Sequence, residues 1–560
     1  MKNLFSTISL CFILNISLNA QSIQWIRDAG STPFSAIENG TAVDADENGN
    51  VYVTGHLSID SYFSTLLVSA QQDGCLAKYN AAGTVQWVKT FGGPGAVDIQ
   101  EAAVKVSVAD NAVYVCGAFR TQFANPMVIF DSVTYTYAGN SRHGFLAKYD
   151  LNGNIQWMKH GGGAGIGAGF NDIDIDDHGR IVVVGTVDGT NIFDTLSLTY
   201  DGGILLRFLP DGTLTDLVKL NDISAVHQEA RKVEVAPGSG NIYVGGAFFD
   251  NIMLNGFSAN ASVFTVFELK LDSSLTCQWI ASGGGTNTSW MNGLAIDAYE
   301  NSFITGHASG DTVKFGNQFF NGHTSSDNEI ITLKINDAGI PQWLHHGGSS
   351  VNDDALDIIA DANGNTVITG FLGGNVPSAN FDSIQLPILT QSTHCFLARY
   401  DSNGLITYAK IMGGGSNDVG SGLAFANDST FYFTGTAQSS APWDNILYIP
   451  CCLDPNLIVA KFNYDDNVGT GINEVDKTEF SLFPNPFQSS ITLSFLLSDA
   501  KNSSITIYDV TGRTILTIPL QKLQKGENKI SVDLSELTKG IYFCRLTSMG
   551  NMKALKLVKQ

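Results

Sequence analysis

Alternating oxygen-bearing side chains near residue 45 could bind a hard cation. The run Asp44-Ala-Asp46-Glu-Asn48-Gly49 places three of them two residues apart, the spacing at which calcium loops begin. The equivalent turn of a later copy reads Asp361-Ala-Asn363-Gly364, and Gly55 stands where a calcium loop has its bidentate Glu. We therefore expect an Asn-Gly hairpin turn here, with calcium at Asp44, Asp46 and Asn48 as the alternative.

A second set of polar side chains recurs just before an apolar strand in three parts of the chain. Its members are Asn171, Asp172, Asn352, Asp353, Asp354, Asn417 and Asp418. In a ring of repeats they would surround one mouth of a central channel, and loops on a rigid scaffold often carry binding residues. Capping of the chain's crossovers by Asx side chains is the alternative. These seven residues are our candidate binding site.

Other residues with chemical potential lack the partners that their chemistry needs. Glycine clusters such as Gly161-Gly162-Gly163 are not followed by the Lys-Ser/Thr and helix of a phosphate loop. His160 and His346 occupy matching places in copies that need not be neighbours, so we predict no shared metal. No HExxH or GxSxG motif and no Ser-His-Asp order is present. We predict no catalytic residue and, apart from the calcium alternative, no metal or cofactor.

All of these residues lie on a repeat that occurs seven times before residue 467. Its strongest marker is an apolar strand built around Gln-Trp, or a degenerate version of it, with intervals of 60 to 70 residues. The marker positions are Trp25, Trp87, Trp157, Leu217, Trp279, Trp343 and Tyr408. A fixed period of this size indicates a solenoid, a propeller or a repeat array.

Each repeat has three further strands before its Gln-Trp strand. The first two are joined by a turn, and the second ends at a glycine, such as Gly55 or Gly117. The third, such as residues 145–149, is joined to the Gln-Trp strand by a hairpin turn at Asn152-Gly153 or its equivalent, since these residue types tolerate positive φ. Four antiparallel strands form one propeller blade. The composition, with 44% hydrophobic residues, 15% charged residues and 58 glycines, also favours an all-β fold.

The chain begins with an orphan copy of the fourth strand. Residues 21–27 carry the Gln-Trp pattern, whereas the seventh repeat stops after its third strand at residues 457–463. Pairing of these two segments would close the ring and remove two exposed sheet edges. The fold predicted for residues 21–466 is therefore an all-β, seven-bladed β-propeller closed by the N-terminal strand.

The repeat resembles the bacterial SBBP-type β-propeller repeat. The resemblance rests on residues 51–55, on residues 145–150 and on the Gly-Gly pairs after the fourth strands, and it covers about residues 22–466. The fourth copy departs most: it has Leu217 in place of Trp, and its first turn reads Ala236-Pro-Gly-Ser-Gly240.

The N-terminus predicts export. Residues 1–20 combine a basic Lys2, an apolar stretch and a small residue before Gln21, which is the pattern of a cleaved signal peptide. No later segment has the roughly 18 consecutive apolar residues that span a bilayer. We therefore expect no transmembrane anchor.

Charge and cysteines narrow the partners and the environment. Residues 1–466 carry 20 Lys+Arg and 45 Asp+Glu, whereas residues 467–560 carry 11 and 8. The acidic body disfavours nucleic acid as a partner. Seven cysteines follow the signal peptide, an odd number without CxxC spacing, so no disulfide framework is expected. A loop disulfide at the vicinal pair Cys451-Cys452 remains an alternative.

The C-terminus has a different pattern. After a polar linker at residues 467–478 come four motifs in order, Phe483-Pro-Asn-Pro486, residues 507–513, residues 534–543 and residues 553–560. Residues 479–560 resemble the type A C-terminal sorting domain of the type IX secretion system of Bacteroidetes. The motif residues are Pro484, Asn485, Pro486, Gly512, Gly540, Tyr542 and Lys556.

The resemblance implies a fold and partners for this segment. It implies a small Ig-like β-sandwich that is recognised by the type IX translocon and removed by a sortase near the linker. Delivery then ends in release or in attachment to surface lipopolysaccharide. Asp-Ser/Thr-apolar triplets at Asp131, Asp194, Asp311 and Asp382 also resemble the O-glycosylation sites of exported Bacteroidetes proteins, with a turn before an outer strand as the alternative.

Together these patterns predict a secreted or outer-membrane-surface protein that binds or adheres to an extracellular glycan or protein. An extracellular polysaccharide lyase or hydrolase on a propeller scaffold is the second hypothesis. A structural spacer in a surface layer is the third. The residues that differ between copies must decide among these three hypotheses. The repeat pattern does not show which of these residues matter for function.

Overall fold

The computed structural model divides the chain into two compact units, Met1–Asp465 and Asp466–Gln560. It describes residues 22–31, 37–70, 73–93, 97–121, 127–136, 142–223, 227–322, 327–388, 390–427, 429–438, 440–443, 446–448, 450–451, 455–463, 480–497, 504–509, 514–520, 526–548 and 551–560. The predicted signal peptide and linker lie outside these residues. Within them the chain is all-β, without helices, and none of their elements is a helix that could cross a membrane.

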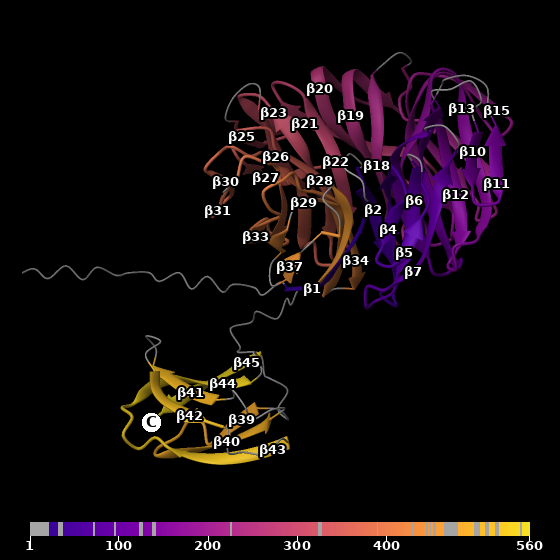
Figure 1. Cartoon of the computed structure of the whole chain (residues 1–560). Coiled ribbons are helices and arrows are strands. Elements are labelled where there is room, and N and C mark those ends of the chain that lie inside the picture. Colours follow the sequence, from indigo (N-terminus) through magenta and orange to yellow (C-terminus); the bar gives the residue numbers. More distant parts are fainter. Residues whose placement is uncertain are drawn as a thin grey trace, which may run out of the picture. The chain divides into compact units, whose positions relative to one another are not determined.

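The first unit contains seven innermost strands that contact one another in a cycle. They are β2 (Asn39–Ala45), β8 (Val97–Ser107), the C-terminal part of β13 (Ile155–Ile175), β18 (Gln228–Val235), β22 (Ser289–Ile296), β28 (Asp354–Ala360) and β34 (Val419–Asn427). Each contacts the next in this order, and β34 contacts β2. Figure 1 shows the indigo β2 beside the orange β34. Repeats are numbered one to seven by these strands.

Outside each innermost strand lie antiparallel partners. The second strands are β3 (Val51–Leu57), β9 (Ala112–Thr121), β14 (Ile181–Phe193), β19 (Ile242–Leu254), β23 (Ser302–Ser309), β29 (Thr366–Leu372) and β35 (Thr430–Ala437). The third strands are β6 (Asp73–Tyr79), β12 (His143–Asp150), β16 (Gly202–Phe208), β20 (Phe257–Leu271), β26 (Asn328–Ile335), β32 (His394–Tyr400) and β38 (Asn456–Asn463).

The fourth strands carry the Gln-Trp marker. They are β7 (Val85–Gly92), the N-terminal part of β13, β17 (Leu214–Lys219), β21 (Cys277–Gly285), β27 (Pro341–Gly348), β33 (Ile406–Met412) and, in repeat seven, β1 (Ser22–Gly30). Strand β1 pairs with β38 from Ser22–Asn463 to Ala29–Leu457. The predicted pairing of the N-terminal strand with the last repeat is confirmed.

Short outer hairpins join neighbouring repeats. They are β4–β5 (Ser61–Phe63, Leu66–Val68), β10–β11 (Met127–Phe130, Val133–Thr136), the end of β14 with β15 (Leu196–Thr199), β24–β25 (Thr312–Phe315, Gln318–Asn321), β30–β31 (Ser378–Phe381, Ile384–Pro387) and β36–β37 (Ala441–Trp443, Ile446–Tyr448). The first five of these pair with the fourth strand of the preceding repeat. A residue such as Phe193 thereby lies against Gly161, where a Cβ would come within 2.1 Å of its ring. The same contact occurs at Gly283 with Phe315 and at Gly347 with Phe381, and it explains the glycine at these three positions.

The turns differ from the predicted two-residue type. Asp46 N–H donates to Asn50 O at 2.9 Å and Gly49 N–H to Asp46 O at 2.8 Å, which defines a three-residue loop with Gly49 at φ +74°. Asp150 and Gly153 repeat this geometry. Two-residue turns occur instead at the outer hairpins, where Asp131, Asp194 and Asp382 have positive φ. Three of the four predicted triplets therefore lie in turns, whereas Asp311 precedes β24.

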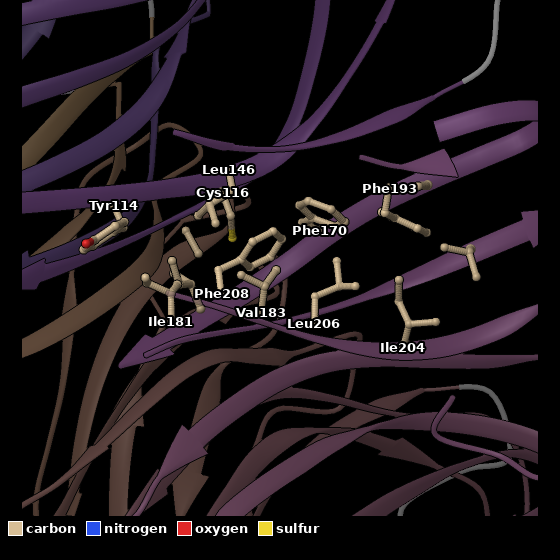
Figure 2. Packing of buried hydrophobic residues seen from close by; sticks show 14 of the residues in the cluster. Tyr114, Cys116, Leu146, Phe170, Ile181, Val183, Phe193, Ile204, Leu206 and Phe208 are labelled. Atoms are coloured by element: carbon tan, nitrogen blue, oxygen red, sulfur yellow. The ribbon is translucent and has the colours of Figure 1, made fainter. Parts of the chain in front are cut away.

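Apolar side chains fill the space between neighbouring sheets. Figure 2 shows one such cluster, to which β9 and β12 of repeat two contribute Tyr114, Cys116 and Leu146, and β14 and β16 of repeat three contribute further residues. Its other labelled members are Phe170, Ile181, Val183, Phe193, Ile204, Leu206 and Phe208. All ten are buried. At about 1.5–3 kcal/mol for each large apolar side chain, such clusters hold the repeats together.

The second unit is a β-sandwich. One sheet has the order β39-β40-β43 (Phe480–Phe483, Ser490–Leu497, Gly526–Asp533), and the other has the order β42-β41-β44-β45 (Thr514–Pro519, Ser504–Asp509, Gly540–Ser548, Asn551–Lys559). Both sheets contribute to one core, which includes Leu493, Val532, Ile507 and Leu557. Alternating apolar residues in short strands produce this arrangement.

Candidate functional site

A cavity of about 580 Å³ runs along the innermost strands of the first unit. All seven strands line it, each with at least one residue, as represented by Thr41, Lys105, Asp172, Glu234, Leu294, Asp357 and Leu423. Each of these strands also has a register irregularity near its start, which re-aims the bulged side chain. We call this cavity the channel.

Charged side chains are concentrated on the channel walls of repeats one to four. Asp44, Lys105, Asp174 and Glu234 occupy equivalent positions on four successive innermost strands. Lys105 Nζ lies 2.8 Å from Asp174 Oδ1. The equivalent positions of repeats five to seven are Ala295, Ile359 and Ala424, so this row of charged side chains is confined to repeats one to four.

Several channel carboxylates also connect neighbouring repeats. Asp44 Oδ2 accepts a hydrogen bond from Val106 N–H at 2.7 Å, and Asp172 Oδ2 accepts one from Val233 N–H at 3.0 Å. Asp357 Oδ2 accepts one from Leu423 N–H at 2.8 Å. These bonds satisfy backbone donors beside the bulges, so the carboxylates have a structural role.

The enclosed charges perturb one another. Burial raises the pKa of Glu234 well above its usual value, and the nearby Asp174 raises it further. Burial alone would lower the pKa of Lys105, but Asp174, Glu234 and Asp44 hold it well above its usual value. Burial also raises the pKa of Asp357 to about 6. The channel therefore contains a charged lysine beside a carboxyl group that favours its protonated form.

A groove of about 450 Å³ opens beside the channel between repeats three and four. Its walls come from the ends of strands at the side of the ring where the chain crosses between repeats, and they include Arg142, Asp188, Asp201, His227 and Phe264. Asn171 and Glu229 line both the groove and the channel. The two cavities are therefore adjacent, and the groove forms part of one channel mouth.

Aromatic rings of repeats four and five cluster at this mouth, and two of them, His227 and Phe264, line the groove. Phe264 stacks on Trp290 with ring centroids 4.9 Å apart and an interplanar angle of 22°. Phe249 and His227 lie around Phe264, with centroids 5.9 and 6.4 Å from it. The Arg231 guanidinium lies over Trp290 at 5.4 Å, a cation–π contact. We call His227, Phe249, Phe264 and Trp290 the aromatic cluster.

The predicted binding residues fall into two groups. Asn171 and Asp172 line the channel. Asp353 instead accepts hydrogen bonds from Ser349 N–H and, at 2.7 Å, Gly373 N–H, and Asp418 accepts from Gly414 N–H at 2.7 Å and Gln438 N–H at 3.0 Å. Both carboxylates are buried crossover caps, and burial raises the pKa of each to about 6.

The remaining predicted residues lie beside these caps. Asn352 and Asn417 accept hydrogen bonds at 3.1 Å from the N–H groups of Asn328 and Thr393. Asp354 lies 2.9 Å from His307 Nδ1. The structure thus does not bring the seven predicted residues together in one ring of equivalent positions.

The residues of the calcium alternative make separate contacts. Asp46 accepts hydrogen bonds from Asn48 N–H and Asn50 N–H at 3.0 and 2.9 Å, and Asp44 points to Val106 of the next repeat. The three side chains therefore do not converge on one point. Among the described residues no group of three or more His, Cys, Asp and Glu is arranged to hold a metal.

The histidines and the vicinal cysteines have local surroundings. His160 packs on Tyr135 at a centroid distance of 3.7 Å, and His346 packs on Phe320 at 4.4 Å. They belong to the fourth strands of repeats two and five, which are not neighbours. Cys451 is exposed and its N–H donates to Asp28 at 2.8 Å, whereas Cys452 lies outside the described residues.

Sequence reasoning missed Phe264, Trp290, Arg231 and Glu229. One signal for them existed: Trp290 is a tryptophan outside the Gln-Trp marker positions. The other three residues carry no motif, because these four residues come from three strands, which meet only when the sheets pack side by side.

In the second unit, the sorting-motif residues lie on or beside the two sheets. Pro484, Asn485 and Pro486 are exposed after β39, whereas Tyr542 in β44 is buried. Asn485 Oδ1 accepts from Val558 N–H at 2.8 Å. Gly540 starts β44 and Lys556 lies in β45; Gly512 lies outside the described residues.

This segment matches a known family. Residues 481–560 match the model of the secretion system C-terminal sorting domain. The C-terminal unit is a type IX sorting domain. The sorting domain marks the chain for secretion or for the cell surface.

No curated protein sequence matches the chain, whereas a comparison with solved structures finds several distant similarities. A protein of unknown function from Dyadobacter fermentans is 9% identical, and the match covers 80% of this chain and 99% of that one with a TM-score of 0.36. An ulvan lyase bound to GlcA(1-4)Rha3S is 10% identical, with 71% and 92% covered and a TM-score of 0.37.

PorZ, a surface component of the type IX secretion system of Porphyromonas gingivalis, is 9% identical. The match covers 96% of this chain and 100% of that one, with a TM-score of 0.21. All three TM-scores lie below 0.5, so none of these likenesses indicates a ligand or an activity for this chain.

Proposed function

We propose that the first unit is a closed seven-bladed β-propeller that binds an extracellular ligand at the groove side of its channel. The cyclic contacts of the innermost strands, the β1–β38 pairing and a cavity lined by all seven strands support the propeller. Closure leaves no unpaired inner edge that would invite aggregation. The scaffold is then rigid, and its mouth can present fixed side chains.

The observation that carries the binding function is the groove that meets the channel at Asn171 and Glu229. Its volume lies within the roughly 300–1,000 Å³ that is typical of ligand sites. It combines an aromatic wall with a few polar groups, which is the composition of such sites. Two of its residues, Asp188 and Phe264, are not repeated at the equivalent positions of the other repeats, so the repeat itself does not require them.

The sorting domain directs where this binding takes place. We propose that residues 1–20 are removed on export, that the type IX translocon recognises residues 479–560, and that a sortase cuts near residues 467–478. The mature propeller is then released or attached to surface lipopolysaccharide. A role as an inert spacer does not account for a groove with repeat-specific aromatic residues.

Hydrogen–deuterium exchange on the full chain tests the proposed site. The protein is incubated with extracellular polymers, namely polysaccharides, peptides and proteins. Binding should slow exchange in residues 186–202 and 227–231, while the outer hairpin at 312–321 stays unchanged as an internal control. Protection confined to the outer hairpins, or none with any polymer, would contradict the proposal.

One observation favours polysaccharide cleavage as a second candidate function. Glu234 lines the channel, and burial followed by Asp174 raises its pKa well above the usual value, as in carboxylic acids that donate a proton to a leaving group. Release of reducing ends from a polysaccharide, abolished by Glu234→Gln, would support this function. Binding without release of reducing ends would rule out cleavage and leave binding as the proposed function.

A further inference from the structure

We infer that the groove ligand is an uncharged, hydroxyl-rich oligosaccharide with one sugar ring lying on the face of Phe264. This inference rests on the proposed function and adds the chemical class of the ligand. It follows from three properties of the groove: one apolar face, a rim of hydrogen-bonding groups, and a balance of charge that disfavours anions.

The apolar face is that of Phe264. Phe264 lines the groove and stacks on Trp290 behind it. His227 and Phe249 approach it at interplanar angles of 85° and 46°. The Phe264 ring is therefore held in place by its neighbours. Because the ring is already fixed, little side-chain entropy is lost when a ligand covers it. A pyranose ring presents a flat C–H face of similar size.

Hydrogen-bonding groups surround this face. Asp188 lines the groove, and its carboxylate has no hydrogen bond or ion pair with the described residues. Asp201 also lines it and uses Oδ1 to accept a hydrogen bond from Gly189 N–H at 2.6 Å. Carboxylates accept hydrogen bonds well, and each has about four lone-pair sites. Donors from sugar hydroxyls satisfy such acceptors, whereas an apolar ligand leaves them unpaired.

The charges of the groove disfavour an anionic ligand. Three carboxylates, those of Asp188, Asp201 and Glu229, line it together with the guanidinium of Arg142. The nearby Arg231 lies 3.6 Å from Glu229 and over Trp290. The whole segment 1–466 has 45 acidic against 20 basic residues. Such a field repels a polyanion, whereas hydroxyl groups carry no charge to repel.

Affinity electrophoresis and titration calorimetry on the full chain test the inference. The probes are soluble β-1,3-glucan, α-glucan, mannan and xylan as neutral polymers, alginate and chondroitin sulfate as anionic polymers, and a lysine-rich peptide as a cation. At least one neutral polymer should bind. Phe264→Ala should weaken that binding by about tenfold or more, in line with the loss of one aromatic contact.

Two further variants separate the site from the fold. Asp188→Ala removes a carboxylate that has no hydrogen bond or ion pair within the described part of the chain, and it should weaken binding at least threefold while the melting temperature is unchanged. Phe319→Ala removes an aromatic ring that is 67% exposed on β25, outside the groove, and should leave binding unchanged. Phe264→Tyr keeps the stacking face and should retain most of the affinity.

The outcomes distinguish the inference from the function on which it rests. Binding of only anionic or cationic probes with protection at 186–202 and 227–231 would overturn the sugar class and leave the binding site standing. Neutral-polymer binding that Phe264→Ala and Asp188→Ala both leave intact would overturn the assignment of the ligand to this groove. If no probe binds in electrophoresis or calorimetry and none protects residues 186–202 and 227–231 from exchange, the proposed function itself would be overturned.

Discussion

Trp25 Nε1 donates a hydrogen bond to Ala81 O at 3.1 Å, and its indole ring lies against Gly83. Trp25 belongs to repeat seven and Gly83 to repeat one, so this contact lies across the junction that β1 closes. Trp87, Trp157 and Trp279 donate in the same way to Leu151, Pro210 and Asp337 of the following repeats. The tryptophan of the Gln-Trp marker in one repeat therefore packs against the glycine turn of the next repeat.

The exceptions to this pairing support its physical cause. The fourth strand of repeat three has Leu217 in place of Trp, and the facing turn of repeat four has Leu275 at φ +67° in place of glycine. Repeat six has Tyr408, and repeat seven has no hairpin turn because β38 and β1 are not consecutive in the chain. Where no indole has to be accommodated, the glycine is absent.

Replacement of Gly83 by Ala should destabilise the first unit. A Cβ there would come within 2.7 Å of the Trp25 ring, and φ is +75°. Gly256 has a similar φ of +89° but open space around it, so Gly256→Ala measures backbone strain alone. We expect a loss of about 1 kcal/mol for Gly256→Ala and about 2 kcal/mol more for Gly83→Ala. Equal losses in denaturant unfolding would contradict the contact.

A circular permutant should fold as well as the natural chain. In it, residues 22–30 are moved to follow Asn463 through an Asn-Gly turn, and residues 464–560 come after them. Ser22 pairs with Asn463 at the end of the β1–β38 ladder, so a short turn can join them. The melting temperature should stay within a few degrees of that of the natural chain. A matched permutant with Gly-Ser repeats in place of residues 22–30 should aggregate; if it were equally stable, ring closure by β1 would be disproved.

The stability contributed by Asp418 should increase as the pH falls from 7 to 5. Burial raises its pKa to about 6, so the folded state binds more protons than the unfolded state in this range, and stability is lost as the pH rises through 6. Relative to Asp418→Asn, the natural protein should gain about 1 kcal/mol between pH 7 and pH 5. Thermal melts of both proteins across this range measure the difference; a constant difference would show that Asp418 is ionised throughout.

Lys105→Met should destabilise the channel wall. Lys105 Nζ lies 2.8 Å from Asp174 Oδ1, and its removal takes away the cation paired with this buried carboxylate, at a cost of about 3 kcal/mol. Lys89→Met is the control, because Lys89 and Asp131 form an exposed pair at 3.2 Å that contributes less than about 1 kcal/mol. Lys105→Met with Asp174→Asn should recover part of the loss. Additive effects of the two channel substitutions would argue against their coupling.

Deletion of residues 481–560 should strand the protein in the periplasm, because this segment is the sorting domain. Surface labelling and cell fractionation measure the distribution. As a control, residues 467–560 fused to an unrelated exported reporter should bring that reporter to the surface. Normal surface delivery of the truncated chain would show that sorting does not depend on this domain.

The sequence determined the parts of this protein that depend on local pattern. Alternating apolar residues, turn glycines and the Gln-Trp marker predicted the strands and the order of the repeats, and the orphan strand at Trp25 predicted its pairing with β38. The C-terminal motifs predicted the sorting domain. The sequence alone did not show that turn glycines such as Gly83 also receive an indole ring.

Only the tertiary structure decided where chemistry can occur. Asp172 and Asp353 looked equivalent in sequence, yet Asp172 lines the channel and Asp353 caps a crossover. Phe264 and Trp290 come from strands of different repeats and meet only because the sheets pack side by side. Repetition in the sequence shows the contacts that every repeat must make, whereas the proposed binding groove uses residues that are specific to a few neighbouring repeats.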